Sequence, residues 1–309
     1  MDKDTKIATR QSFGEALKEL GEKNEEIVVL DADLAGATKT NIFGKAFPDR
    51  FFDMGIAEQD MIGTAAGFAS CGKIPYAASF AAFATGRSYD QIRSSICYPK
   101  ANVKICGTHA GVTVGEDGAT HQMLEDLSLM RGLPNMTVIC PSDDTQARWA
   151  VEEVSKFDGP VYLRLSRAAT PIIYSAGTKF EIGKMVQFGE GTRATVFATG
   201  AVVSESLLAQ EILAAEGIDI RVIDVHTIKP IDREMIIKCA KETEKLISIE
   251  DHSIIGGLGS AIAEVLADEY PKKLVRMGMK DCFGKSGKAM ELLEYFGLVS
   301  KNIVEEVKR

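Results

Sequence analysis

The sequence is poor in the features that mark membrane and secreted proteins. It has no apolar run long enough to cross a bilayer, and residues 1–6 carry too many charges for a secretory signal peptide. Tandem repeats and low-complexity segments are missing as well. We therefore expect a cytoplasmic protein with no membrane partner.

Basic residues are fewer than acidic residues. The chain has 36 Lys and Arg against 44 Asp and Glu, which gives a formal net charge of -8. Binding to nucleic acid or to a membrane surface calls for clustered basic residues, so this balance argues against both. Any anionic substrate would need local arginines or lysines.

Paired cysteines are also lacking. The six cysteines are scattered without a C-x-x-C pair, and several lie in apolar, strand-like runs. This pattern indicates buried free thiols in a reducing compartment rather than disulfides. The four histidines likewise show none of the usual zinc-binding spacings, so no metal ligand is predicted.

What is present is an alternation of strand and helix. With 309 residues and 45% hydrophobic composition, the chain is long enough for two globular domains. Continuous apolar strands separated by amphipathic helices predict a doubly wound parallel sheet covered on both faces. The predicted strands are 27–30, 51–54, 75–78, 103–106, 137–140 and 161–165, and the predicted helices are 10–22, 58–70, 87–96, 122–131 and 144–155.

The alternation breaks at Pro171, Gly177, Gly183 and Gly189 and then resumes. We predict a first domain over 1–170, a linker over 171–190 and a smaller α/β domain over 191–309. In the second domain the predicted strands are 194–198, 218–224, 245–249 and 273–277, and the predicted helices are 203–215, 233–244 and 259–270.

Glu58 is the most informative carboxylate. It lies among Gly55, Ala57 and Met61, where a short strand gives way to a helix, so we expect it to be buried. Burial without a fixed positive partner favours holding or sharing a proton, which suits a hydrogen bond to a ring nitrogen. The alternative is a helix-start Glu favoured by the helix dipole.

Two of the four histidines, His109 and His121, flank the glycine-rich turn 115–118, which also contains Asp117. Proton transfer and hydroxyl recognition fit this set better than metal binding does. The alternative is a solvated loop with capping and turn residues. A second glycine-rich turn, 256–259, resembles a dinucleotide fingerprint, but no ribose-binding acid ends the next strand, so tight packing is favoured.

Aromatic and basic residues supply further candidates. Phe80 and Phe83 lie in an alanine-rich stretch that offers either a core contact or a slot for a flat heterocycle. Arg10 and Arg167 stand at element boundaries, where they are either surface residues or ligands for phosphate through the bidentate guanidinium.

Four motifs in order resemble the pyrimidine-binding half of a transketolase. They are Gly-Ile-Ala-Glu-Gln (55–59), Ser-Phe-Ala-Ala-Phe (79–83), Gly-Thr-His (107–109) and Gly-Glu-Asp-Gly-Ala-Thr-His-Gln (115–122). The match runs on to the last helix, and it implies the C-terminal subunit of a split transketolase. The stretches 134–138 and 254–259 resemble deoxyxylulose-phosphate synthase and 2-oxo-acid dehydrogenase β subunits equally well. His109 and the terminal pattern 283–288 with 296–298 favour transketolase.

The resemblance implies a role for each site residue. It places Glu58, Phe83, Phe80, Asp33 and, more weakly, Arg87 at thiamine diphosphate. His109 and Asp117 would bind hydroxyls of the donor sugar, and His121 would assist proton transfer. Arg10 and Arg167 would bind the sugar phosphate. One position departs from the family, because its usual hydroxyl residue falls on Ala37, or on Thr38 if the loop is shifted.

The resemblance also implies a partner. Family members hold the cofactor's pyrophosphate and Mg²⁺ with a Gly-Asp-Gly motif and an Asn, which this chain lacks. We expect an N-terminal subunit to supply them in an α₂β₂ assembly. The expected reaction moves a two-carbon unit from a ketose phosphate such as xylulose 5-phosphate to an aldose phosphate such as ribose 5-phosphate, in the pentose phosphate pathway. A non-catalytic scaffold paralogue is the alternative of another class.

Overall fold

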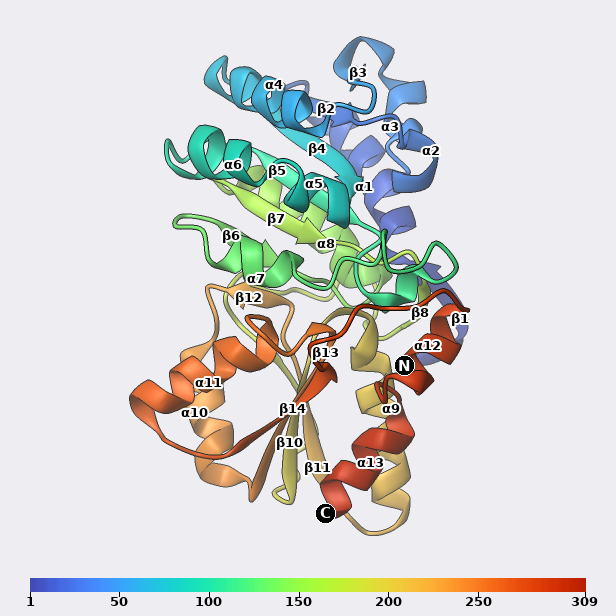
Figure 1. Cartoon of the computed structure of the whole chain (residues 1–309), viewed down its shortest axis with the longest axis vertical. Helices are drawn as coiled ribbons and strands as arrows, with labels where there is room; N and C mark the ends of the chain where they lie inside the picture. Colours follow the sequence, from blue (N-terminus) through green and yellow to red (C-terminus); the bar gives the residue numbers. More distant parts are fainter.

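Two parallel-sheet domains make up the molecule (Figure 1). The structure is a computed structural model that describes the backbone of residues 1–309 and all side chains except that of Lys3. The α/β class and the two-domain organisation predicted from the sequence are confirmed.

The first domain is built on a seven-stranded sheet with the order β12-β6-β7-β5-β4-β2-β3. Its strands are parallel except β12, which runs antiparallel to β6. The bounds are β2 (Ile27–Asp31), β3 (Phe51–Asp53), β4 (Ile74–Phe80), β5 (Lys104–Thr108), β6 (Thr137–Ile139), β7 (Val161–Arg164) and β12 (Thr227–Lys229).

Helices cover this sheet. They are α1 (Thr9–Lys23), α2 (Ala35–Thr38), α3 (Asn41–Ala46), α4 (Glu58–Ser70), α5 (Ala81–Gly86), α6 (Tyr89–Gln91), a π-helix (Ile92–Cys97), α7 (Asp126–Arg131) and α8 (Asp144–Lys156). Short 3₁₀ turns occupy Pro48–Arg50 and Val112–Val114. All five residues of β2 are buried, as the apolar sequence predicts. The apolar face of α1, with Phe13 and Leu17, packs into the same core cluster as Ile27 and Val29.

The second domain contains a five-stranded sheet with the order β14-β13-β10-β11-β9, in which only β9 is antiparallel to its neighbour. Its strands are β9 (Val186–Phe188), β10 (Ala194–Ala198), β11 (Ile220–Asp224), β13 (Lys245–Ser253) and β14 (Leu274–Met279). Its helices are α9 (Val203–Ala215), α10 (Arg233–Glu242), α11 (Leu258–Glu269), α12 (Ala289–Tyr295) and α13 (Ser300–Lys308), with a 3₁₀ turn at Gly200–Val202.

One strand crosses from the second domain to the first, and a separate two-stranded ribbon lies near their junction. An antiparallel ribbon joins β1 (Asp2–Ala8) to β8 (Ala169–Ile172) beside the domain junction (Figure 1). Strand β12 follows β11 in the chain but returns to the edge of the first sheet. The two sheets are therefore not assembled from two unbroken halves of the sequence.

Two predicted helices are wrong in their bounds. The helix predicted over 87–96 is observed as α6 and the π-helix, from Tyr89 to Cys97, and a separate helix, α5, which was not predicted, precedes it directly after Phe80 ends β4. The helix predicted over 122–131 is only Asp126–Arg131. The preceding residues form an irregular loop held by side-chain hydrogen bonds.

Candidate active site

The carboxyl ends of the parallel strands bring the candidate residues to one edge of the first sheet, where open α/β sheets bind ligands. Strand β3 leads to Glu58 at the start of α4, and β4 ends at Phe80. Strand β5 leads directly to His109, and β7 leads to Arg167. Residues far apart in the sequence thus meet in one place.

Glu58 is buried as predicted, with 4% of its surface exposed. The expectation that it lacks a positive partner is wrong. Arg87 Nη1 lies 2.6 Å from Glu58 Oε1, and 49% of the Arg87 side chain is exposed. Adjacency in the sequence could not show this contact, because 29 residues separate the pair.

The Arg87 guanidinium also covers Phe83, with its central carbon 4.1 Å from the ring centroid. A flat cation that donates N–H groups therefore lies against both Glu58 and Phe83. An aminopyrimidine is flat too and would present a ring to Phe83 and a ring nitrogen to Glu58. These residues fit the pyrimidine of thiamine diphosphate once Arg87 moves aside.

Phe80 contacts both His109 and Phe83. Only 7% of Phe80 is exposed, and its ring stacks on His109 with centroids 3.8 Å apart. Phe83 contacts the edge of His121 at 5.3 Å between centroids. The two phenylalanine rings stack with centroids 5.8 Å apart, so the four rings form one connected group.

His109 has a defined hydrogen-bonding state. Arg10 Nη1 donates to His109 Nε2 over 3.0 Å, so Nδ1 carries the proton and donates to Thr108 Oγ1 over 2.9 Å. Burial and the charges of Arg10 and Arg167 lower the pKa of His109 to about 3. The imidazole is therefore neutral at physiological pH and acts through hydrogen bonds.

The predicted anion-binding arginines lie near each other. Arg10 Nη1 also donates to the carbonyl of Ala37 over 2.8 Å, and burial together with the charge of Arg167 lowers the pKa of Arg10. Arg167 donates to the carbonyl of Val114 and lies 3.2 Å from Glu116 Oε2. A bound anion would relieve the repulsion between the two guanidinium groups.

Lys39 is a cation that the sequence analysis missed. Its charge contributes to the lowered pKa of His109, so it belongs to the same region. It has a left-handed backbone with φ 74° at the end of α2, a position that usually favours glycine or asparagine. The sequence alone gives no sign of this backbone conformation, so Lys39 could not be singled out from it.

The loop residues Asp117 and His121 differ in burial. Asp117 Oδ2 is 3.7 Å from Arg167 Nη1, and Asp117 is exposed. His121 is half-buried; its Nδ1 is 2.9 Å from Thr120 Oγ1, and its ring contacts Phe83. Asp33 is exposed, whereas Asp31 is the buried acid and accepts hydrogen bonds from Thr38 and Thr40. Thr38 is thereby directed away from any ligand.

The glycine-rich turn before α11 holds a carboxylate of the protein itself. Glu250 accepts hydrogen bonds from the amides of Leu258 and Gly259, over 2.6 and 2.9 Å. A Cβ on Gly257 would lie 2.0 Å from Glu250 Oε2. The packing interpretation of this motif is confirmed, because Glu250 occupies the amides that a nucleotide would need.

The residues that the structure describes contain no group of three or more His, Cys, Asp or Glu side chains arranged for a metal ion. All six cysteines are free; Cys71 and Cys282 are exposed, and the other four are buried. Among the described helices, none combines the length and apolar character needed to cross a membrane.

Comparison with known proteins identifies both domains. The family described as "Transketolase, pyrimidine binding domain" matches residues 5–172, and "Transketolase, C-terminal domain" matches residues 183–303. A solved structure described as "Split gene transketolase, inactive beta4 tetramer" is 50% identical, with a TM-score of 0.91 over 98% of this chain and 97% of that chain.

Relatives of similar length and of greater length both match. The "Putative transketolase C-terminal section" of Methanocaldococcus jannaschii is 51% identical over 97% of this chain and 96% of its own. The "6-deoxy-6-sulfo-D-fructose transketolase subunit SqwH" of a Clostridium species is 44% identical over 96% and 92%. The rat transketolase is 39% identical, and the matched region is 98% of this chain but 49% of the rat protein. The chain therefore belongs to the transketolase family and carries its pyrimidine-binding and C-terminal domains.

Proposed function

We propose that this chain supplies the pyrimidine side of a thiamine diphosphate site in a two-chain transketolase. The observation that supports this most directly is the arrangement of Glu58, Phe83 and Arg87, in which a flat N–H donor already contacts a buried carboxylate and an aromatic face. The cofactor, when bound, supplies the electron sink for cleaving and forming carbon–carbon bonds beside a carbonyl.

Each residue of the chain then has a task. Glu58 hydrogen-bonds the pyrimidine ring nitrogen and controls its protonation, and Phe83 holds the ring by stacking. Phe80 supports His109 from behind, and Asp33 is proposed to lie near the cofactor. His121, with Nε2 not bonded to Thr120, moves a proton at the sugar carbonyl.

His109 and the arginines bind the sugar. Arg10 releases His109 Nε2 when it turns to an anionic substrate, so the neutral imidazole becomes free to accept a hydrogen bond from a sugar hydroxyl. Asp117 binds a second hydroxyl. Arg10, Arg167 and Lys39 provide three cations on an otherwise acidic chain, which favours sugars with a terminal anion.

The anion has two candidate sources. A ketose phosphate such as xylulose 5-phosphate, with ribose 5-phosphate as acceptor, would place the reaction in the pentose phosphate pathway. The relationship to the sulfo-fructose transketolase subunit supports a sulfonate instead. Both anions present three oxygens to arginine, so the cations alone favour neither.

The pyrophosphate and Mg²⁺ are proposed to bind a second subunit. This chain lacks the Gly-Asp-Gly motif, and its described residues contain no acidic or histidine cluster for the metal. We propose an α₂β₂ assembly with active sites at the subunit interface. The solved relative named as an inactive tetramer of β chains supports the view that such chains are inactive alone.

An assay of two-carbon transfer tests this proposal. The chain is assayed with thiamine diphosphate and Mg²⁺, alone and with a candidate N-terminal subunit, using xylulose 5-phosphate or 6-deoxy-6-sulfofructose as donor. Activity only in the mixture supports the proposal, and the faster donor identifies the anion. Activity of the chain alone would contradict the need for a partner, and a mixture that binds cofactor but is silent with both donors would favour a scaffold or another thiamine diphosphate reaction.

A further inference from the structure

The loop that carries both active-site histidines has a strained backbone. His109 has φ 57°, and Gly111 follows with φ 81°. A left-handed conformation is unfavourable for a residue with a side chain, so surrounding contacts must hold His109 in place. Its ring contacts with Phe80, Thr108 and Arg10 fix the side chain but leave the turn after it to be explained.

Asp251, from β13 of the second domain, holds that turn. Its Oδ1 accepts a hydrogen bond from the amide of Val112 over 2.8 Å, and its Oδ2 accepts from the amide and hydroxyl of Thr113 over 3.3 and 2.8 Å. Only 3% of Asp251 is exposed. A Cβ on Gly111 would lie 2.1 Å from Asp251 Oδ2, so the carboxylate packs directly against the turn.

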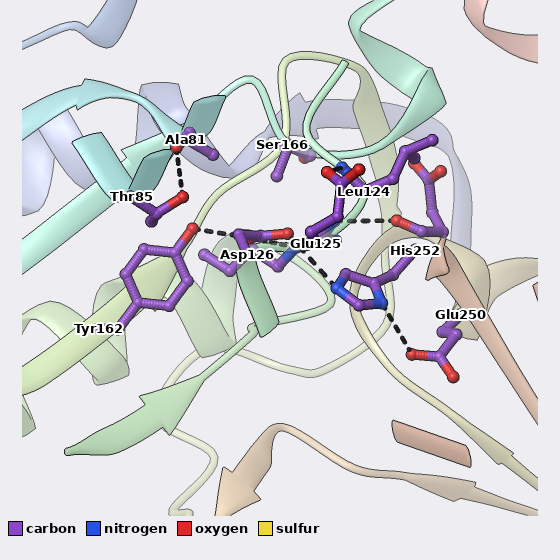
Figure 2. A network of polar contacts seen from close by, with 12 residues as sticks. Ala81, Thr85, Leu124, Glu125, Asp126, Tyr162, Ser166, Glu250 and His252 are labelled. Atoms are coloured by element: carbon purple, nitrogen blue, oxygen red, sulfur yellow. Dashed lines mark hydrogen bonds and ion pairs between the residues drawn. The ribbon is translucent and has the colours of Figure 1, made fainter. Parts of the chain in front are cut away.

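An arginine of the first domain also holds the backbone of Asp251. Arg164 Nη2 donates to its carbonyl over 2.9 Å, and Arg164 Nε donates to Asp126 Oδ2 over 2.7 Å. Figure 2 shows the surrounding contacts, in which Tyr162 points at Asp126 and His252 lies between Asp126 and Glu250. The position of Asp251 therefore depends on the packing of the second domain against the first.

Gln122 closes the other end of the loop. Its Nε2 donates to the carbonyls of Gly115 and Lys285, over 3.1 and 2.8 Å, and thereby joins the residue next to His121 to the segment before α12. The second domain thus contacts the loop at two separate points. The contact nearer to His109 is the one made by the Asp251 carboxylate.

We propose that Asp251 is a positioning residue for His109, an inference that rests on the proposed function for its catalytic consequence. By accepting three hydrogen bonds from residues 112 and 113, its carboxylate keeps the turn closed and His109 in the strained conformation that meets Arg10. The second domain thereby takes part in building the sugar-binding geometry of the first.

The neighbouring Glu250 provides a matched control. It is a buried carboxylate of the same strand that also accepts two backbone amides, but these belong to α11 of its own domain. Loss of either carboxylate disturbs the second domain. Only loss of Asp251 releases the turn after His109.

The test compares Asp251→Asn with Glu250→Gln and Thr113→Val. Asparagine replaces one acceptor oxygen by an N–H₂ donor that faces backbone N–H groups, and Thr113→Val removes one of the three hydrogen bonds. The chain has four histidines, so ¹³C-histidine labelling allows each ring to be titrated by NMR without substrate. Two-carbon transfer by the mixed subunits is measured in parallel.

With Asp251→Asn we expect the His109 ring resonances to move and the pKa of His109 to rise as the ring leaves Arg10. We expect kcat to fall about tenfold or more, with the cofactor Kd unchanged. Thr113→Val should give smaller changes in the same direction, and Glu250→Gln should leave the His109 titration as in wild type.

An unchanged His109 titration in Asp251→Asn, or the same shift in Glu250→Gln, would overturn the positioning role. The titration also separates this inference from the proposed function. A wild-type mixture without two-carbon transfer would contradict the function, whereas the His109 resonance still reports directly on Asp251.

Discussion

Arg87 Nη1 lies 2.6 Å from Glu58 Oε1, and the same guanidinium covers the ring of Phe83 at 4.1 Å. These are the two contacts that the aminopyrimidine of the cofactor is proposed to make. In the free chain a side chain thus fills the proposed cofactor slot. Because half of the Arg87 side chain is exposed, it has room to move into solvent when the slot is taken.

Replacing Arg87 should therefore tighten cofactor binding. The ion pair of the half-exposed Arg87 contributes up to about 1 kcal/mol and the cation–π contact about 0.5–1 kcal/mol, so Arg87→Met should lower the Kd about 2- to 30-fold. Calorimetric titration of thiamine diphosphate into the mixed subunits measures this. Arg93→Met, an exposed arginine in the following π-helix, is the matched control. A Kd that rises in Arg87→Met would show that Arg87 binds the cofactor instead of competing with it.

Arg167 should distinguish charged from uncharged sugars. A hydrogen bond to a charged group contributes about 1.5–3 kcal/mol, so Arg167→Met should raise KM for ribose 5-phosphate about 10- to 100-fold. The KM for unphosphorylated ribose should change little. Arg193→Met removes an exposed arginine paired with Glu244 in the second domain and should affect neither substrate. Equal losses for both sugars in Arg167→Met would assign Arg167 to holding the loop at Val114 and Glu116.

His226 should make the fold sensitive to acid. It is buried against Trp149 and Phe180, and burial lowers its pKa from 6.5 to about 4. Between these values the unfolded chain binds more protons than the folded one, so folding stability is lost as the pH falls from about 6.5 to about 4. The shift corresponds to about 3 kcal/mol.

Urea unfolding of wild type and His226→Gln between pH 7 and pH 4 measures this effect. Glutamine does not titrate, so the free energy of unfolding of His226→Gln should fall less over this pH range than that of wild type. The difference between the two losses should be about 3 kcal/mol. Identical pH dependence in the two proteins would mean that His226 titrates in the folded state as it does in the unfolded chain.

The fold was largely predictable because its strands are buried on both faces and read as continuous apolar runs, as in β2 and β5. Strand β12 was not predictable. It has only three residues, Thr227–Lys229, and it pairs with β6 of the other domain. Tertiary packing, not the local sequence pattern, determines this pairing. The start of α5 at Ala81 was missed because strand and helix meet there without a turn residue.

The burial of Glu58 and the gathering of His109 and His121 in one region were predictable, because the sequence motifs fix both residue type and position there. Contacts between residues that are distant in the sequence were not predictable. The Arg87 guanidinium reaches Glu58 across 29 positions, and Asp251 reaches the Val112 amide across 139. Lys39 was missed because its meaning depends on a left-handed backbone that one sequence does not display.

The central claim is that Glu58 acts on the pyrimidine of the cofactor, and Glu58→Gln tests it most directly. Asp60→Asn is the matched control, since Asp60 is an exposed acid in the same first turn of α4. Two-carbon transfer and cofactor binding are measured together in the mixed subunits. We predict that Glu58→Gln still binds thiamine diphosphate but loses transfer by about 100-fold or more, whereas Asp60→Asn keeps both. Transfer at the wild-type rate by Glu58→Gln would contradict the account.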